Sequence, residues 1–141
     1  MNYFKCEYFK IQELVDRNTY EKWGEAAWMF LRPEALYSLD GIRKYFNKRV
    51  FVNNWAFGGD FQWRGLRPPT CTVGVWYSQH RFGNGFDCDV EGVTADEVRG
   101  EIVTNENHPL FTHITCLETD ITYVHLDCRN IENRIRLVKG L

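Results

Sequence analysis

The sequence predicts one α+β domain in which N-terminal helices pack on a small antiparallel sheet. Two observations support this class: helical periodicity is concentrated in the first third of the 141-residue chain, and strand-like alternation follows mostly after it. The length is typical of a single domain, and 44% hydrophobic residues suffice for one core. Repeats, low-complexity segments and linkers are lacking, so residues 1–141 are expected to form a single domain.

Three helices are expected in the first third of the chain. A short helix covers residues 11–17, and a second covers 19–31 with Thr19 as its N-cap. A third runs from 33 to about 47, because Pro33 suits the first turn of a helix, where its missing N–H has no partner to lose. The apolar residues of this third helix recur at three- and four-residue spacing, at Leu36, Leu39, Ile42 and Phe46.

The later elements are expected to be strands and one further helix. Thr94 and Glu97 form a capping-box pattern that opens a helix running to about residue 105. Strands are expected at 49–53 and 86–90, in a hairpin of 112–117 with 121–128, and at 134–138.

Residues 55–77 form a long segment rich in glycine, proline and aromatic residues. A loop of this length without secondary structure is unusual in a compact domain and is commonly functional. Its aromatic side chains are expected either to line a substrate groove or to form a small core within the loop; they are Trp55, Phe57, Trp63, Trp76 and Tyr77.

Composition and charge exclude several classes of protein. The net charge of −2 and the pI of about 6.1 provide no basic field for nucleic acid. No apolar run approaches the roughly 20 residues that span a bilayer, and the N-terminus lacks a signal-peptide stretch, so we expect a protein made in a cytoplasm without membrane insertion. The five cysteines form no Cys-x-x-Cys pair, which indicates reduced thiols. His108 and His113 are expected to be structural or exposed.

Two of the expected strands combine an apolar face with a polar face of unusual composition. Side chains alternate between the two faces of a strand. The strand at 86–90 carries Asp87 and Asp89 on its polar face, and the second strand of the hairpin carries His125 and Asp127. If these strands are neighbours, Asp87 and His125 lie close enough to bind one metal ion.

His80 supplies a third ligand for such an ion. It lies seven residues before Asp87, and Gly83 and Gly85 permit the sharp reversal that folds His80 back towards that carboxylate. Two imidazoles and one carboxylate leave a fourth coordination position for water, which is the arrangement expected of a catalytic zinc ion.

Two motifs in these segments resemble those of a known family. Residues 78–87, S-Q-H-R-F-G-N-G-F-D, match the pattern S-x-H-x-x-G-x-A-x-D, with glycine in place of alanine. Residues 123–127, Y-V-H-L-D, match a second signature, aromatic-x-H-x-D. Together they resemble the zinc D-alanyl-D-alanine peptidases, which include VanY-type carboxypeptidases and phage endolysin peptidases. The resemblance covers about residues 34–129 and implies a Hedgehog/DD-peptidase fold.

The resemblance also implies roles for single residues. It implies zinc on His80, Asp87 and His125. In the family, an arginine of an S-G-x-R segment contacts the substrate near the metal. The corresponding segment here reads R-G-L-R, so Arg67 matches this arginine, whereas Arg64 replaces the serine and is a rival for the role.

Two residues are candidates for the general base. Many relatives have a glutamate three residues before the second histidine, where this chain has Thr122. Glu118 is the nearest upstream acid, although alternation puts it on a face with Cys116 unless a bulge intervenes. Asp127 lies on the polar face but also suits the orientation of the His125 imidazole. We favour Glu118.

The expected function is hydrolysis of an amide bond in peptidoglycan stem peptides by a monomeric, phage-encoded zinc peptidase of the D-Ala-D-Ala carboxypeptidase or L-Ala-D-Glu endopeptidase type. Glu118 takes the proton of the attacking water, and Arg67 helps zinc to stabilise the oxyanion. Such a protein would join a virion or be released to the wall. One alternative is a non-catalytic, zinc-stabilised structural or wall-binding domain of a phage particle. Another is a zinc hydrolase of some other amide.

Overall fold

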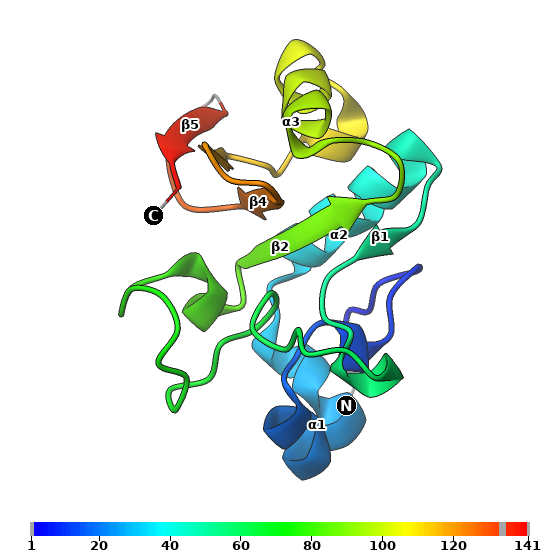
Figure 1. The fold of residues 1–141 in the computed structure, drawn as a ribbon, viewed down its shortest axis with the longest axis vertical. Helices are drawn as coiled ribbons and strands as arrows, with labels where there is room; N and C mark the ends of the chain where they lie inside the picture. The colour runs from blue at the N-terminus through cyan, green and yellow to red at the C-terminus, as the bar shows by residue number, and fades with distance from the viewer. Residues whose placement is uncertain (1, 133–134, 141) are drawn as a thin grey trace.

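The computed structural model describes residues 2–132 and 135–140, which form an α+β fold of three α-helices and a five-stranded sheet (Figure 1). The helices are α1 (Arg17–Trp23), α2 (Pro33–Phe46) and α3 (Ala95–Thr104). Short 3-10 helices lie at Ile11–Glu13, Gly24–Phe30, Trp55–Phe57, Gln79–Phe82 and Pro109–Phe111. None of the described helices has the length and hydrophobicity required to span a bilayer.

The sheet is mixed, so the expectation of an antiparallel sheet is wrong at one edge. Its strands are β1 (Val50–Phe51), β2 (Gly85–Val90), β3 (Cys116–Thr119), β4 (Val124–Asp127) and β5 (Arg136–Lys139), in the order β1-β2-β4-β3-β5. All neighbours are antiparallel except β3 and β5, which are parallel. β4 is flanked on both sides, by β2 and β3, so the last strand pairs at the free edge of β3. It runs parallel to β3. The expected start of this strand, residue 134, lies outside the described residues.

The expected helix at 19–31 is wrong in its bounds. α1 begins at Arg17, because the carboxylate of Asp16 accepts a hydrogen bond from the backbone N–H of Thr19 at 3.1 Å and acts as the N-cap. It ends at Gly24, whose φ of 54° suits glycine and breaks the helical backbone, and the chain continues as a 3-10 helix. The helix expected at 11–17 is limited to the 3-10 turn Ile11–Glu13.

The other two helices are close to expectation. α2 has Pro33 in its first turn and ends where Asn47 adopts a left-handed conformation with a φ of 50°. α3 opens with the expected capping box, in which the Thr94 side chain accepts from the backbone of Glu97 and the Glu97 side chain accepts from the backbone of Thr94.

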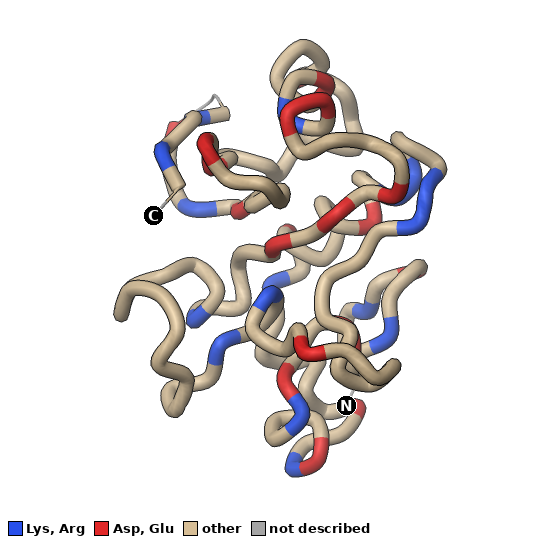
Figure 2. Tube along the Cα trace, viewed as in Figure 1, with Lys and Arg blue, Asp and Glu red and all other residues tan. Residues whose placement is uncertain are grey.

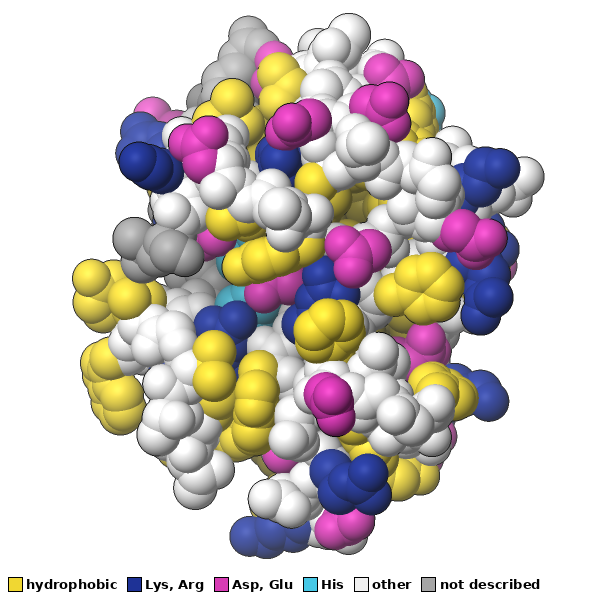
Figure 3. All heavy atoms as spheres, in the orientation of Figure 1, with side chains coloured by type: hydrophobic (Ala, Val, Ile, Leu, Met, Phe, Trp, Pro, Cys, Tyr) yellow, Lys and Arg dark blue, Asp and Glu magenta, His cyan; other side chains and the backbone are white. Residues whose placement is uncertain are grey.

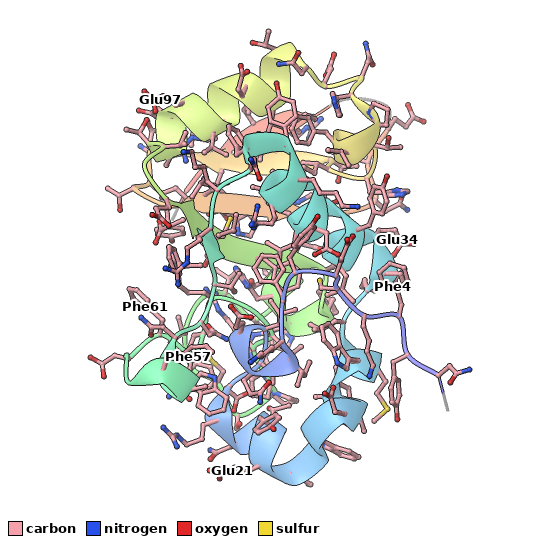
Figure 4. All side chains as sticks on the ribbon, turned by 90° about the vertical axis from the view of Figure 1, so that its right-hand side faces the viewer. Phe4, Glu21, Glu34, Phe57, Phe61 and Glu97 are labelled. Atoms are coloured by element: carbon pink, nitrogen blue, oxygen red, sulfur yellow. The ribbon has the colours of Figure 1, made fainter. Side chains whose placement is uncertain are left out.

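The two faces of the sheet differ in chemistry. α2 lies behind β2 in Figure 1 and faces the viewer in Figure 4, and its apolar residues pack with the apolar sheet residues in one buried core. That core includes Leu36, Leu39, Ile42, Phe86, Cys88, Leu117, Val124 and Leu126. The opposite face carries charged side chains. Figure 2 shows acidic positions along β2 and basic positions on the loop segments beside it. The polar face of the sheet therefore has a packed core behind it.

Candidate metal centre

Three buried side chains converge on the polar face. His80 comes from the 3-10 helix Gln79–Phe82, Asp87 from β2 and His125 from β4. Asp87 and His125 are directly opposite each other in the antiparallel pair, so their side chains share a face. One possible ligand atom from each residue lies within 4.8 Å of the other two. The exposed fractions are only 2%, 4% and 3%, so these polar groups are buried together.

Interatomic distances show which nitrogen of each imidazole ring faces the carboxylate of Asp87. Nε2 of His80 lies 3.2 Å from Oδ1 of Asp87, and Nδ1 of His125 lies 2.9 Å from the same oxygen. The two imidazole rings are 5.1 Å apart between centroids. Nε2 of His80, Nδ1 of His125 and Oδ1 of Asp87 therefore point at one small volume.

The turn that carries His80 is built for this approach. Ser78 begins the 3-10 helix, with its hydroxyl accepting a hydrogen bond from the backbone N–H of His80 at 3.3 Å. Gly83 ends the helix with a φ of 66°, and a Cβ at this position would overlap the carbonyl oxygen of Phe30. The expected reversal is thus made at Gly83. Gly85 instead begins β2, opposite Asp127.

Each imidazole is oriented through its other nitrogen. Nδ1 of His80 lies 2.9 Å from the carbonyl oxygen of Gly65, and Nε2 of His125 lies 2.7 Å from Oδ2 of Asp127. When these nitrogens carry the ring protons and donate to those oxygens, the converging nitrogens each present a lone pair. This pattern, in which a ligand histidine donates its remaining N–H to a carbonyl or carboxylate, is typical of metal sites.

Electrostatics favours the charged forms of Asp87 and His125. Burial raises the pKa of Asp87, but the charge of His80 and the hydrogen bond with His125 outweigh burial and hold this pKa well below its usual value. Burial lowers the pKa of His125, but hydrogen bonds with Asp127 and Asp87 raise it to about 9. A proton and a metal ion therefore compete for this histidine.

Three carboxylates of the polar face are paired with arginines. The distances are 3.3 Å between Arg67 and Asp87, 2.9 Å between Arg64 and Asp89, and 2.6 Å for the closest contact between Arg129 and Asp127. Within the described residues, Glu118 is the carboxylate of this face that has no arginine partner. Glu118 is thus distinguished from the other three acids by its surroundings.

Arg67 and Arg64 both reach the site, in different ways. Arg67 contacts Asp87 itself, and its Nε donates to the carbonyl oxygen of Trp63 at 2.7 Å. Arg64 contacts Asp89, two residues further along β2, and its guanidinium lies 4.8 Å from the ring of Phe61 and 5.5 Å from that of Tyr123. Arg67 is therefore the arginine in contact with a predicted ligand.

Glu118 lies on the polar face without a bulge. β3 begins at Cys116, which is opposite Asp127, so alternation places Glu118 on the same face as His125. The expectation that Glu118 shares a face with Cys116 is confirmed, but this face is the polar one, because Leu117 is the β3 residue that packs in the core. Oε1 of Glu118 lies 3.9 Å from Nε2 of His125, the nitrogen remote from Asp87.

Asp127 has the surroundings of an orienting group. It is fully buried, and both of its oxygens accept hydrogen bonds from Arg129. Burial raises the pKa of Asp127, but the hydrogen bonds with Arg129 and His125 outweigh burial and lower it. Thr122 is exposed in the bend before β4.

The remaining residues of the prediction fall into two groups. Trp55 donates its indole N–H to the carbonyl oxygen of Val15 at 2.7 Å and belongs to the fold, whereas the exposed Phe57 lies at the edge of the molecule near Phe61 (Figure 4). Trp76 and Tyr77 are exposed and line a cavity of about 170 Å³ with Arg67, which is the link of this cavity to Asp87.

The two other histidines lie away from the centre. His108 accepts a hydrogen bond from the backbone N–H of Leu110 at 3.1 Å and caps a 3-10 helix, and the exposed His113 contacts the ring of Tyr37. Both are structural or exposed, as expected.

Sequence reasoning overlooked two contributors to the centre. Arg129 lies two residues after Asp127, and the carbonyl of Gly65 lies within the R-G-L-R segment. The position of Arg129, two residues after Asp127 and just beyond the end of β4, was the available signal. Nothing in the sequence indicates that a glycine carbonyl would bind His80.

Figure 3 shows histidine and acidic side chains at the bottom of a hollow, between basic and hydrophobic side chains. This donor set, two imidazole nitrogens and a carboxylate, fits zinc better than calcium or magnesium, which prefer oxygen.

Comparison of the chain with protein-family models, curated proteins and solved structures finds no match. The function is therefore inferred from the geometry of His80, Asp87 and His125 and from the two motifs, at residues 78–87 and 123–127, that contain them.

Proposed function

We propose that this chain is a zinc-dependent peptidase that holds its metal on His80, Asp87 and His125. The observation that carries the proposal is the convergence of one nitrogen from each histidine on Oδ1 of Asp87, while each second nitrogen is held by an oxygen acceptor. An ordinary buried ion pair would need only one imidazole. Two imidazoles of defined orientation around one carboxylate suit a cation with open coordination positions.

The chemistry divides between the metal and the protein. A bound zinc ion supplies a Lewis acid and lowers the pKa of water. The protein must supply a group that accepts a proton, and Glu118 is the carboxylate of the polar face that forms no ion pair with an arginine among the described residues. Its side chain is 23% exposed, so it has room to move, and catalytic contacts are often long before substrate binds.

Arg67 supports the same reaction. Its side chain is only 12% exposed and is fixed by its bonds to Trp63 and Asp87. A fixed guanidinium beside the scissile bond stabilises negative charge on a substrate oxygen, or binds a carboxylate of the substrate. Arg67 also lines a cavity together with Trp76 and Tyr77.

The substrate class comes from the resemblance of the two motifs to zinc D-alanyl-D-alanine peptidases. On that basis we propose a peptidoglycan stem peptide as the substrate and a Hedgehog/DD-peptidase fold. The mixed five-stranded sheet, with two of the three proposed ligands on β2 and β4, is compatible with this proposal.

A second candidate is a non-catalytic zinc module with a structural or wall-binding role. Two observations favour it. Thr122 replaces the usual glutamate, and the contact of Glu118 in the site is with Nε2 of His125, on the side of the ring away from Asp87. This candidate shares the metal with the first and lacks only the base.

The deciding experiment measures metal content together with muropeptide release from purified peptidoglycan, with and without a chelator. One zinc per chain and chelator-sensitive release would support the peptidase, and mass spectrometry of the fragments would name the bond. Bound zinc without release would favour the structural module. A protein that binds no zinc would overturn both candidates.

A further inference from the structure

A chain of three side chains runs from the partly exposed surface to the metal centre. Arg129 is 31% exposed in its side chain, Asp127 is fully buried, and His125 is a proposed ligand. Asp127 accepts three hydrogen bonds from Arg129, namely from the backbone N–H at 3.1 Å, Nε at 2.8 Å and Nη2 at 2.6 Å. Its Oδ2 also lies 2.7 Å from Nε2 of His125.

The fork of Arg129 fixes the plane of the Asp127 carboxylate. Nε binds Oδ1 and Nη2 binds Oδ2, which is the two-point arrangement that only a guanidinium offers. A carboxylate held at both oxygens cannot rotate about its terminal bond. Oδ2 is thereby kept in the position from which it binds His125.

The orientation of the His125 ring depends on that oxygen. If the ring turned about its bond to Cβ, Nδ1 would leave Asp87, from which it is now 2.9 Å away. The contact between Nε2 and Asp127 opposes this rotation. We propose that Arg129 is a positioning residue of the metal centre, which acts through Asp127 to hold Nδ1 of His125 towards the ion.

The backbone near Arg129 is held independently of its side chain. The hydroxyl of Thr115 donates to the carbonyl oxygen of Arg129 at 2.7 Å, and the backbone N–H of Thr115 donates to the carbonyl oxygen of Asp127 at 3.0 Å. Loss of the guanidinium therefore leaves the end of β4 in place, and its effect should appear at the metal centre more than in the fold.

This inference rests on the proposed metal site but not on peptidase activity. The test measures zinc affinity by competition with a chromophoric chelator, and the visible absorption of the cobalt(II)-loaded protein, which reports ligand geometry. Arg129→Met should weaken zinc binding roughly tenfold and alter the cobalt spectrum. Arg129→Lys, which keeps the charge without the fork, should fall between Arg129→Met and the unsubstituted protein. Arg49→Met, at an exposed pair with Glu91, is the matched control and should change neither.

A double-substitution cycle separates positioning from a general structural effect. In a chain that already carries Asp127→Asn, Arg129→Met should cause no further loss of zinc affinity, because the residue through which it acts has changed. Equal losses in both backgrounds, or unchanged affinity and spectrum in Arg129→Met, would overturn the inference alone. Failure of the unsubstituted protein to bind zinc or cobalt would instead overturn the proposed site, and the inference with it.

Discussion

Asp87 and His125 occupy directly opposite positions on two antiparallel strands, and Oδ1 of the aspartate lies 2.9 Å from Nδ1 of the histidine. His80 reaches the same oxygen from a separate turn. The proposed metal therefore depends on the pairing of β2 with β4 and on the turn before β2.

Replacement of either ligand histidine should remove the metal. His80→Ala and His125→Ala each delete one of two nitrogen donors, so we expect zinc content after dialysis to fall from about one per chain to near zero. His113→Ala removes an exposed imidazole and is the control that should retain zinc. Elemental analysis of the purified proteins is the measurement. Full zinc content in His125→Ala would refute the assignment of this ligand.

Replacement of the proposed base should separate metal binding from catalysis. Glu118→Gln keeps the size of the side chain but cannot accept a proton, so zinc should remain while muropeptide release falls by a factor of roughly 10² or more. Release is measured at equal zinc occupancy. Full activity in this variant would move the assignment to Asp127.

The two arginines should differ in their effects. Arg67→Lys loses the planar fork beside Asp87, so we expect kcat/KM to fall roughly 10²-fold with zinc retained. Arg64→Lys disturbs a pair with Asp89, which is not a proposed ligand, and should cost roughly tenfold or less. Kinetics on a soluble stem peptide is the measurement. The reverse order would assign the substrate-binding role to Arg64.

Zinc affinity and metal-free stability should respond to pH in opposite ways. The folded-state pKa of His125 is raised from 6.5 to about 9, so its proton stabilises the metal-free protein fully below pH 6.5, and this stabilisation is lost as the pH rises towards 9. Zinc must displace that proton, so its affinity should rise about tenfold per pH unit across this range. Thermal melting in chelator and chelator competition measure the two effects. Zinc affinity independent of pH would contradict the proton competition.

Substitution of Gly83 should destabilise the protein through the turn that carries His80. Gly83→Ala places a Cβ against the carbonyl oxygen of Phe30 at a positive φ, and we expect a loss of roughly 2 kcal/mol or more. Gly24→Ala is the matched control, because Gly24 also has a positive φ but no atom within 4 Å of the added Cβ. Urea denaturation of both variants gives the comparison, and equal losses would exclude the steric contribution.

The three proposed ligands could be predicted because their signals are local. Asp87 and His125 each lie on the polar face of a strand whose other face is apolar. Gly83 marks the turn that brings His80 back towards β2. The register that places Asp87 opposite His125 is favoured because the apolar faces of β2 and β4 share one core. A shift of the strand pairing by one residue would turn the apolar side chains of one strand away from that core. Local pattern and burial thus agree at this site.

Two other features could not be predicted from the local sequence pattern, and a third was missed although its signal was present. The parallel pairing of β5 with β3 depends on which strand edge is free after the rest of the sheet has formed. Alternation correctly placed Glu118 on one face with Cys116, but only the register that puts Cys116 opposite Asp127 shows that this face is the polar one. The helix expected at 19–31 ignored Gly24, whose positive φ ends α1, so in that case a signal was present and was overlooked.

The contact between Asp87 and His125 joins positions 38 residues apart, and α3 and β3 lie within the loop that it closes. A metal ion bound to these two side chains would act as a cross-link between distant parts of the chain. Like a covalent cross-link of the same span, it would stabilise the folded state by restricting the unfolded chain. All five cysteines are unpaired, so the chain has no disulfide to serve this purpose. The same ion would then both stabilise the fold and take part in the proposed reaction.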